Sequence, residues 1–283
     1  MAFSTTVQPC EDSEWPKVVA TSPWMRPSFY LVFRGVWAAV FLGHLIAHIA
    51  SHDEGAYYLI YLTTWALITQ TISEMLLFSL AILGYRRLSG PPPEKLPVAV
   101  RIEVALWSAV HPVAVVVWLL YFSLVNPIWS FESRPWVTIF AHFVNLIMLV
   151  IGLFASRMPF SALKNFGWSL IYGLAYGLWT IIHYLARVGA SESQPCLDYP
   201  LNECPIYDAF DWHAPLMPAL ILGSIYLIGV PVITGIFGAC VTCRDRLDPE
   251  SKRNEKNMGV GKQPDTGEKV MAEEDKPSSP ECA

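Results

Sequence analysis

Six polar side chains that could take part in chemistry lie inside apolar stretches of this sequence. They are His44, His48, Thr63, His142, Asn145 and His183. A lipid-facing helix has little use for imidazole, hydroxyl or amide groups, so each residue of this set is a candidate for a specific role. When the apolar stretches are threaded through a membrane as described below, all six side chains fall in the same half of the bilayer.

Two of these residues lie at matching depth. Thr63 and His142 are each about six residues from the outer end of their apolar stretch, which is roughly 9 Å along a helix. A neutral histidine can take the proton of a threonine hydroxyl and so make the oxygen a nucleophile. Asn145, one turn after His142, could orient the imidazole or donate to an oxyanion. A site at this depth would meet the ester region of a lipid.

The same residues also have plainer structural interpretations. A threonine in a membrane helix commonly bonds its own helix backbone, and a single histidine commonly has a packing role. His44 and His48 share a helix face and could hold a metal ion, but no cysteine or acidic pair completes a set of ligands. The sequence therefore predicts no metal and no cofactor, and it leaves a Thr63–His142 site open beside a structural role.

The apolar stretches define the fold class. They cover approximately residues 29–51, 57–83, 98–123, 136–155, 166–186 and 215–240. Each is near or above the roughly 20 residues that a helix needs to cross a bilayer. With 53% hydrophobic and 15% charged residues, the chain is predicted to be an all-α membrane protein, a six-transmembrane helical bundle. Its expected partner is the lipid bilayer, and a net charge of -5 argues against nucleic acid.

Lysine and arginine predict the orientation, because cytoplasmic loops near membrane spans are enriched in them. Cations gather before the first stretch, in the second and fourth loops, and after the last stretch: Lys17, Arg26, Arg86, Arg87, Lys95, Arg157, Lys164, Arg244, Arg246, Lys252 and Arg253. This alternation fits six crossings with both termini in the cytoplasm. The polar candidates then lie in the non-cytoplasmic half, in the plasma membrane or an endomembrane.

These boundaries divide the chain into three parts. Residues 1–28 are expected to be a cytoplasmic N-terminal segment and residues 29–240 the transmembrane bundle. Residues 241–283 are expected to be a disordered cytoplasmic tail, because a polar segment of mixed charge cannot bury enough apolar surface to fold. Cys196 and Cys204 fall in a loop predicted to be non-cytoplasmic, where either a disulfide or two free thiols would fit.

Charged residues inside the stretches suggest internal contacts. Arg34 and Glu103 are each about five residues from the cytoplasmic end and could extend their charged groups to the membrane surface. Glu74 lies deeper and is expected to be protonated, paired or facing a cavity. Arg34 is a possible partner for it, either as a structural pair or as part of an ion pathway.

Small residues recur on one face of the fifth stretch. Ser169, Gly173 and Gly177 follow one another at intervals of four residues, which allows a neighbouring helix to approach closely. The neighbour is expected within the bundle, with a second copy of the chain as the alternative.

Three segments resemble a known family. The second stretch opens YYLIYLTTWAL, the fourth contains AHFVNLIMLVIGLF, and the fifth and its loop contain LIYGLAYGLWTIIHYLARVG and CPIYDAFDWHAP. Together they resemble the rolling stone family of multi-pass membrane proteins and, more distantly, the androgen-induced and androgen-dependent TFPI-regulating proteins. The similarity covers roughly residues 30–240.

The resemblance implies two different functions. The distant branch comprises lipid hydrolases that cleave fatty acid esters of hydroxy fatty acids with an intramembrane threonine and a histidine, and those positions match Thr63 and His142 here. Thr64 follows directly and could compete for the nucleophile's role. The rolling stone branch implies a non-enzymatic membrane protein that acts in cell contact or fusion. The resemblance thus suggests a threonine-dependent lipid ester hydrolase, with a lipid ester as substrate, beside a protein without catalytic activity.

Overall fold

The chain folds into helices. The structure, a computed structural model, describes residues 14–51, 55–91, 95–125, 135–189, 205–207 and 210–249, and within these ranges it contains no strand. The helices are α1 (Trp15–Ala20), α2 (Pro27–Ser51), η1 (Gly55–Ile60), α3 (Leu62–Arg87), α4 (Val98–Leu120), η2 (Tyr121–Val125), α5 (Pro135–Ile139), η3 (Phe140–Val144), α6 (Asn145–Ala155), α7 (Ala162–Leu185), α8 (Leu216–Ser224), η6 (Ile225–Gly229) and α9 (Val230–Leu247).

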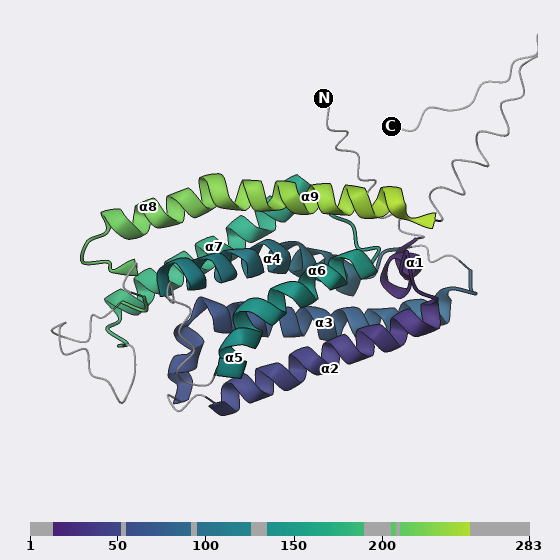
Figure 1. Cartoon of the computed structure of the whole chain (residues 1–283), viewed down its shortest axis with the longest axis horizontal. Helices are drawn as coiled ribbons and strands as arrows, with labels where there is room; N and C mark the ends of the chain where they lie inside the picture. The colour runs from purple at the N-terminus through teal and green to yellow at the C-terminus, as the bar shows by residue number, and fades with distance from the viewer. Residues whose placement is uncertain are drawn as a thin grey trace, which may run out of the picture.

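Several of these helices join into longer rods that lie along the long axis of the molecule (Figure 1). The turns η2, η3 and η6 are π-helical. They continue α4, join α5 to α6 and join α8 to α9 without a break. The rods therefore follow the apolar stretches closely. The clearest differences are that the second rod starts at Leu62, after the 3-10 helix η1, and that the last rod extends to Leu247.

Five rods are long and apolar enough to cross a membrane: Pro27–Ser51, Leu62–Arg87, Val98–Ser123, Trp136–Ala155 and Leu216–Leu247. The expected membrane helices are confirmed to this extent. The helix α7 has 24 residues but is not among the five, because serine, glycine, tyrosine, threonine and histidine lower its hydropathy.

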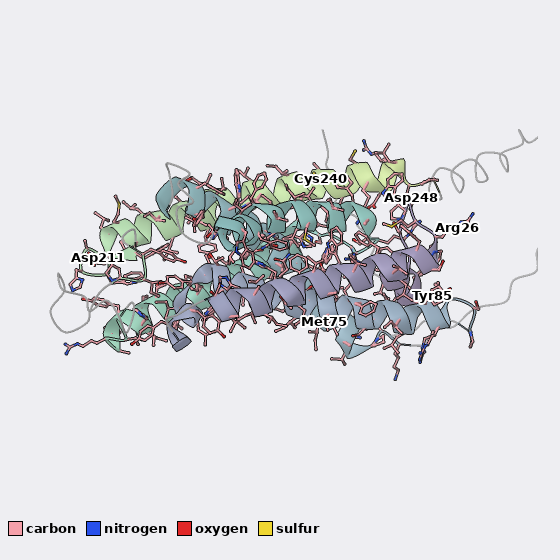
Figure 2. All side chains as sticks on the ribbon, turned by 60° about the horizontal axis from the view of Figure 1, so that its bottom comes forward. Arg26, Met75, Tyr85, Asp211, Cys240 and Asp248 are labelled. Carbon is pink, nitrogen blue, oxygen red and sulfur yellow. The ribbon has the colours of Figure 1, made fainter. Side chains whose placement is uncertain are left out.

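The two ends of the bundle can be named by residues labelled in Figure 2. Arg26, Tyr85 and Asp248 lie at one end, here called the Asp248 end, and Asp211 lies at the other, the Asp211 end. The start of α2, the end of α3 and the end of α9 therefore meet at the Asp248 end. Arg157, just after α6, forms an ion pair with Asp248 there.

The main hydrophobic core runs between α1, α3, α4 and α9, with the end of α6 against it. Its members include Val19, Leu77, Trp107, Leu153 and Phe237. The helix α4 is central, since α3, α6, α7 and α9 all pack against it. Trp107 on α4 is 1% exposed. One of the core's large aromatic side chains is therefore buried on the central helix.

The short helix α1 belongs to this core although it lies in the segment that the sequence assigned to the cytoplasm. Trp15, Val19 and Ala20 are buried and pack with residues of α3 and α9. Gly84 on α3 permits the contact, because a Cβ at this position would lie 2.8 Å from a methyl group of Val19. The segment before α2 is thus packed across the Asp248 end of the bundle (Figure 1).

The helix α7 has its polar and small residues inside and its apolar residues outside. Its buried face consists of Asn165, Ser169, Gly173, Tyr176, Gly177, Thr180 and His183. Its exposed face carries Ile171, Leu174, Leu178, Ile182 and Leu185. At Gly173 an added Cβ would overlap the ring and hydroxyl of Tyr226 on η6. The expected packing of the small residues within the bundle is confirmed.

A buried charged cluster lies toward the Asp248 half of the bundle; we call it the Arg34 cluster, and it comprises Tyr30, Arg34, Ser73, Glu74 and Glu103. Arg34 Nη1 lies 3.2 Å from Glu74 Oε2, which confirms the expected structural pair. The prediction that Arg34 and Glu103 extend to the membrane surface is wrong, because both are 0% exposed. Their helix faces point into the bundle, where each side chain finds polar partners.

Candidate functional site

Histidines and a threonine gather near the Asp211 end, between α2, α3 and the two π-helical turns η2 and η3. This group, here called the histidine cluster, comprises His44, His48, Thr64, Tyr121 and His142. The three histidines and Thr64 are buried, although they sit among apolar helices. Burial of several polar groups at one place marks a candidate site, because each such group is costly to remove from water.

The closest polar contact in the cluster joins α2 to α3. His48 Nε2 lies 3.3 Å from Thr64 Oγ1. Tyr61 precedes α3 and has an extended backbone, and Thr64 lies three residues later in the first turn of the helix. From there the Thr64 side chain reaches His48 near the end of α2. A histidine nitrogen and a threonine hydroxyl at this distance form the pairing that an activated nucleophile requires.

His142 lies in the π-helical turn η3, and aromatic rings hold its neighbourhood together. Its imidazole stacks on Tyr121 with 3.6 Å between the ring centroids and 10° between the planes. Phe140, in the same turn, stacks on His44 at 4.0 Å. His142 also lies near His44 and His48. The stacking contacts therefore join α2, η2 and η3 into one site.

Within the described part of the chain, several polar atoms of this region are buried without a hydrogen-bond partner. They include Nε2 of His44, Nδ1 of His142 and Oδ1 of Asn145. The amide of Asn145 uses its Nδ2 to donate to the carbonyl of Ala141, at 3.4 Å. Polar atoms in this position could bind a polar ligand or a bridging water.

The predicted residues Thr63 and His142 have different partners. Thr63 is half-buried on α3, and its hydroxyl is within hydrogen-bonding reach of Tyr207, between α7 and α8. Burial raises the pKa of Tyr207 to about 12, so this phenol remains a proton donor at neutral pH. His142 instead contacts Tyr121. A Thr63–His142 pairing stays a prediction.

The remaining candidates have structural contacts. His183 Nε2 lies 2.8 Å from the carbonyl oxygen of Gly189, where the chain turns after α7 through positive φ angles at Arg187 and Gly189. Trp212 Nε1 donates to Thr180 Oγ1 at 3.2 Å. Both contacts fasten the segment around α7 to its surroundings.

No group of three or more histidine, cysteine, aspartate or glutamate side chains in the described ranges could hold a metal ion. His44 and His48 are separated by 6.1 Å between their ring centroids. Cys196 and Cys204 lie outside the described residues, so their predicted disulfide stays a prediction.

An apolar groove lies between the α4–η2 rod and the α8–η6–α9 rod. It has a volume of about 340 Å³, and Val116, Leu119, Ser123, Leu220 and Ser224 contribute to its lining. Ser123 belongs to η2, the same π-helical turn as Tyr121. The groove and the cluster therefore share one short element.

Tyr121 and Thr64 are the site residues that the sequence interpretation did not select for the cluster. In the sequence, Thr64 stands out only because it could compete with Thr63 for the nucleophile's role. The π-helical turns that place Tyr121 against His142 leave no periodic pattern in the sequence, because each covers only five residues. Such turns are rare and occur frequently at functional sites.

The chain is similar to Protein rolling stone of Drosophila melanogaster. The two are 23% identical over 227 residues, and the alignment covers 73% of this chain and 76% of that protein. No family model matches the chain, and no solved structure matches it. The similarity supports the resemblance to the rolling stone family. Together with the apolar helices, it identifies the chain as an integral, multi-pass membrane protein.

Proposed function

We propose that this chain is a six-span membrane protein that hydrolyses fatty acid esters with a threonine nucleophile and a histidine base. The observation that carries the proposal is the buried contact of 3.3 Å between His48 Nε2 and Thr64 Oγ1. A base has to come within about 3 Å of the proton-bearing oxygen, or act through one water. The resemblance favours the neighbouring residue pair, Thr63 with His142, for the same chemistry.

The proposed reaction has two steps. The threonine oxygen attacks the acyl carbonyl of the ester while the histidine nitrogen takes the hydroxyl proton. The histidine then gives this proton to the departing alkoxide, so an alcohol leaves and an acyl-threonine remains. Water then attacks the acyl-threonine while the same histidine takes its proton, and the histidine returns this proton to the departing threonine oxygen, which releases a fatty acid and restores the threonine hydroxyl. The Asn145 amide is near His142 in sequence and could stabilise the oxyanion.

The apolar groove at η2 supports a lipid substrate. Its lining is almost entirely aliphatic, as an acyl chain requires. Ser123 of the groove and Tyr121 of the cluster belong to the same turn, so an acyl chain in the groove would lie at the same level along the α4–η2 rod as the cluster. The substrate would enter from the surrounding lipid.

The six-span arrangement includes α7 as the sixth crossing, with both termini in the cytoplasm. The exposed apolar face of α7 suits contact with lipid, whereas its polar residues face other helices. The basic residues at the Asp248 end support a cytoplasmic position for that end. The histidine cluster then lies in the non-cytoplasmic half, in the plasma membrane or an endomembrane.

A fluorophosphonate probe tests the hydrolase proposal in the purified protein. The wild-type protein should be labelled. The single variants Thr64→Ala and His48→Ala should each lose labelling if the observed contact is the catalytic one. Loss in Thr63→Ala and His142→Ala would instead assign the role to the pair favoured by the resemblance. Thr71→Ala is a matched control, because Thr71 is buried on α3 and donates to its own helix at Leu67.

Folded protein that takes up no probe and leaves fatty acid esters intact would contradict the proposal. That result would favour the non-enzymatic alternative of cell contact or fusion. Because all four substitutions lie near one another, each variant should first be shown to elute as a monodisperse species. A variant that elutes normally and lacks labelling has lost chemistry and not its fold.

A further inference from the structure

The Arg34 cluster has more acidic than basic groups. Arg34 contacts Glu74 through Nη1 and donates from Nε to the hydroxyl of Tyr30 at 2.7 Å. Glu103 on α4 accepts a hydrogen bond from Ser73 Oγ at 2.8 Å through Oε1. One guanidinium therefore stands beside two carboxyl groups in a region that is removed from water, where Arg34, Glu74 and Glu103 are at most 1% exposed.

Two further titratable or charged groups lie near the cluster, His111 on α4 and Arg244 on α9, each near enough to interact electrostatically with one of its members. Neither one balances the second carboxyl group, because each has partners of its own. His111 Nδ1 lies 2.9 Å from its own helix at the Trp107 carbonyl. The guanidinium of Arg244 is already bound to three backbone carbonyls and to Asp245.

One carboxyl oxygen of Glu103 lacks a hydrogen bond. This oxygen, Oε2, is buried and has no hydrogen-bond partner among the described residues, and the same is true of Arg34 Nη2. A buried carboxylate normally has each of its oxygens bonded, because an unpaired charge away from water is strongly unfavourable. If both glutamates were ionised, the cluster would carry a net negative charge inside a membrane helix bundle.

We propose that the Arg34 cluster is a proton-binding site in which Glu74 pairs with Arg34 as a carboxylate and Glu103 holds one proton. The bound proton makes the cluster neutral and leaves Glu103 able to donate one hydrogen bond. Glu103 lies about one and a half helical turns after Val98, where α4 starts at the Asp248 end. The path along which Glu103 can exchange its proton with water is therefore shortest at that end.

A proton fits this site better than a metal cation. The Arg34 guanidinium would repel a cation placed between the carboxyl groups, and it already occupies an oxygen of Glu74. In the ranges that the structure covers, no group of three acidic, histidine or cysteine side chains is arranged for a metal. A proton needs only one oxygen and introduces no further ligands. The site is also separate from the histidine cluster, so the two proposals stand independently.

Infrared spectroscopy of the full-length protein in nanodiscs tests the proposal directly. At neutral pH the wild-type protein should show the carbonyl stretch of a protonated carboxyl group, shifted in heavy water. Glu103→Gln should lose this band and remain folded, since glutamine resembles the protonated acid in shape and charge. Asp245→Asn is the control and should keep the band, because Asp245 is 56% exposed.

A second variant tests the charge balance itself. In Glu74→Gln only one carboxyl group remains to neutralise Arg34, so Glu103 should ionise and the band should disappear. If the variants do not fold, labelling all glutamates of the wild-type protein with carboxyl carbon-13 should shift the band, and labelling aspartates should not.

Three results would overturn the proposal: folded wild-type protein without the band, a band that Glu103→Gln leaves unchanged, or a band that moves only with labelled aspartate. A metal-binding site would appear differently. In that case, replacing choline with sodium would abolish the band or raise thermal stability at constant pH, and the proton assignment would be rejected.

Discussion

The ring of Tyr121 lies parallel to the imidazole of His142, with 3.6 Å between the centroids. The contact joins two π-helical turns, η2 and η3, that belong to rods separated in the sequence. A π-helical turn contains one residue more than the corresponding α-helical turn, so it rotates the following side chains around the helix axis. The stack depends on both turns, and it holds the imidazole plane in one orientation.

We expect Tyr121→Leu to destabilise the protein by about 1 kcal/mol, because a stacked aromatic pair contributes roughly 0.5–1.5 kcal/mol beyond the area it buries. Unfolding in mixed micelles would measure the difference. Tyr121→Phe keeps the ring and serves as the control. Equal stability of the leucine and phenylalanine variants would show that the stack contributes nothing.

The contact between Gly173 and Tyr226 predicts a destabilising substitution on α7. In Gly173→Ala the new methyl group would overlap the Tyr226 ring, and overpacking typically costs about 1–3 kcal/mol. In the Tyr226→Ala background the same Gly173→Ala substitution should cost little, because the ring that the methyl group would overlap is gone. Gly235→Ala is the matched control, since a Cβ there meets nothing within 4 Å.

Thermal unfolding of these variants in nanodiscs provides the measurement. If Gly173→Ala unfolds at the wild-type temperature, α7 and the α8–η6–α9 rod are not in the described contact. A loss of the same size when Gly173→Ala is made in the Tyr226→Ala background would point to a different cause, such as a changed path of α7 itself.

Arg244 should be the most sensitive cation near the end of α9. Its guanidinium donates to the carbonyl oxygens of Leu153, Ser156 and Met158, where α6 ends. Hydrogen bonds from a charged donor contribute roughly 1.5–3 kcal/mol each, so Arg244→Met should cost about 3 kcal/mol or more. The exposed Arg246 gives the control, since Arg246→Met should change stability by less than about 0.5 kcal/mol.

Denaturation of the two arginine variants by SDS in mixed micelles would compare them. Similar losses in both would mean that the positive charge at this end matters and the carbonyl contacts do not. A loss confined to Arg244→Met would assign the effect to the junction between α6 and α7.

The proposed crossing by α7 predicts opposite accessibility of its two ends. Lys164 and Val188 are exposed near the start and just after the end of α7. In a variant without other cysteines, Lys164→Cys should react with an impermeant maleimide only after the membrane is opened, and Val188→Cys should react from outside. Labelling of both from one side would exclude the sixth crossing.

Much of the fold was predictable because long apolar stretches require helices in a membrane. The stretch 98–123 became α4 with its continuation η2, and the stretch 136–155 became a rod that begins at Pro135. The pairing of Arg34 with Glu74 was also foreseen, because a deeply placed carboxylate needs a partner and few cations are available inside the stretches.

The site was less predictable because depth along a helix does not determine direction around it. Successive residues of an α-helix differ by about 100°, so Thr63 and Thr64 at nearly equal depth face different neighbours. Thr64 meets His48, whereas Thr63 is near Tyr207. Counting residues from the end of a stretch selects both threonines and cannot separate them.

The helix α1 has a consequence for any shortened form of this protein. A chain that starts at Pro27 would retain all the long rods, yet it would lack Trp15, Val19 and Ala20, three members of the main hydrophobic core. The surface of α3 around Gly84 would then be uncovered. The smallest unit that can fold as described therefore starts upstream of the first long helix, and a fusion partner belongs before residue 14.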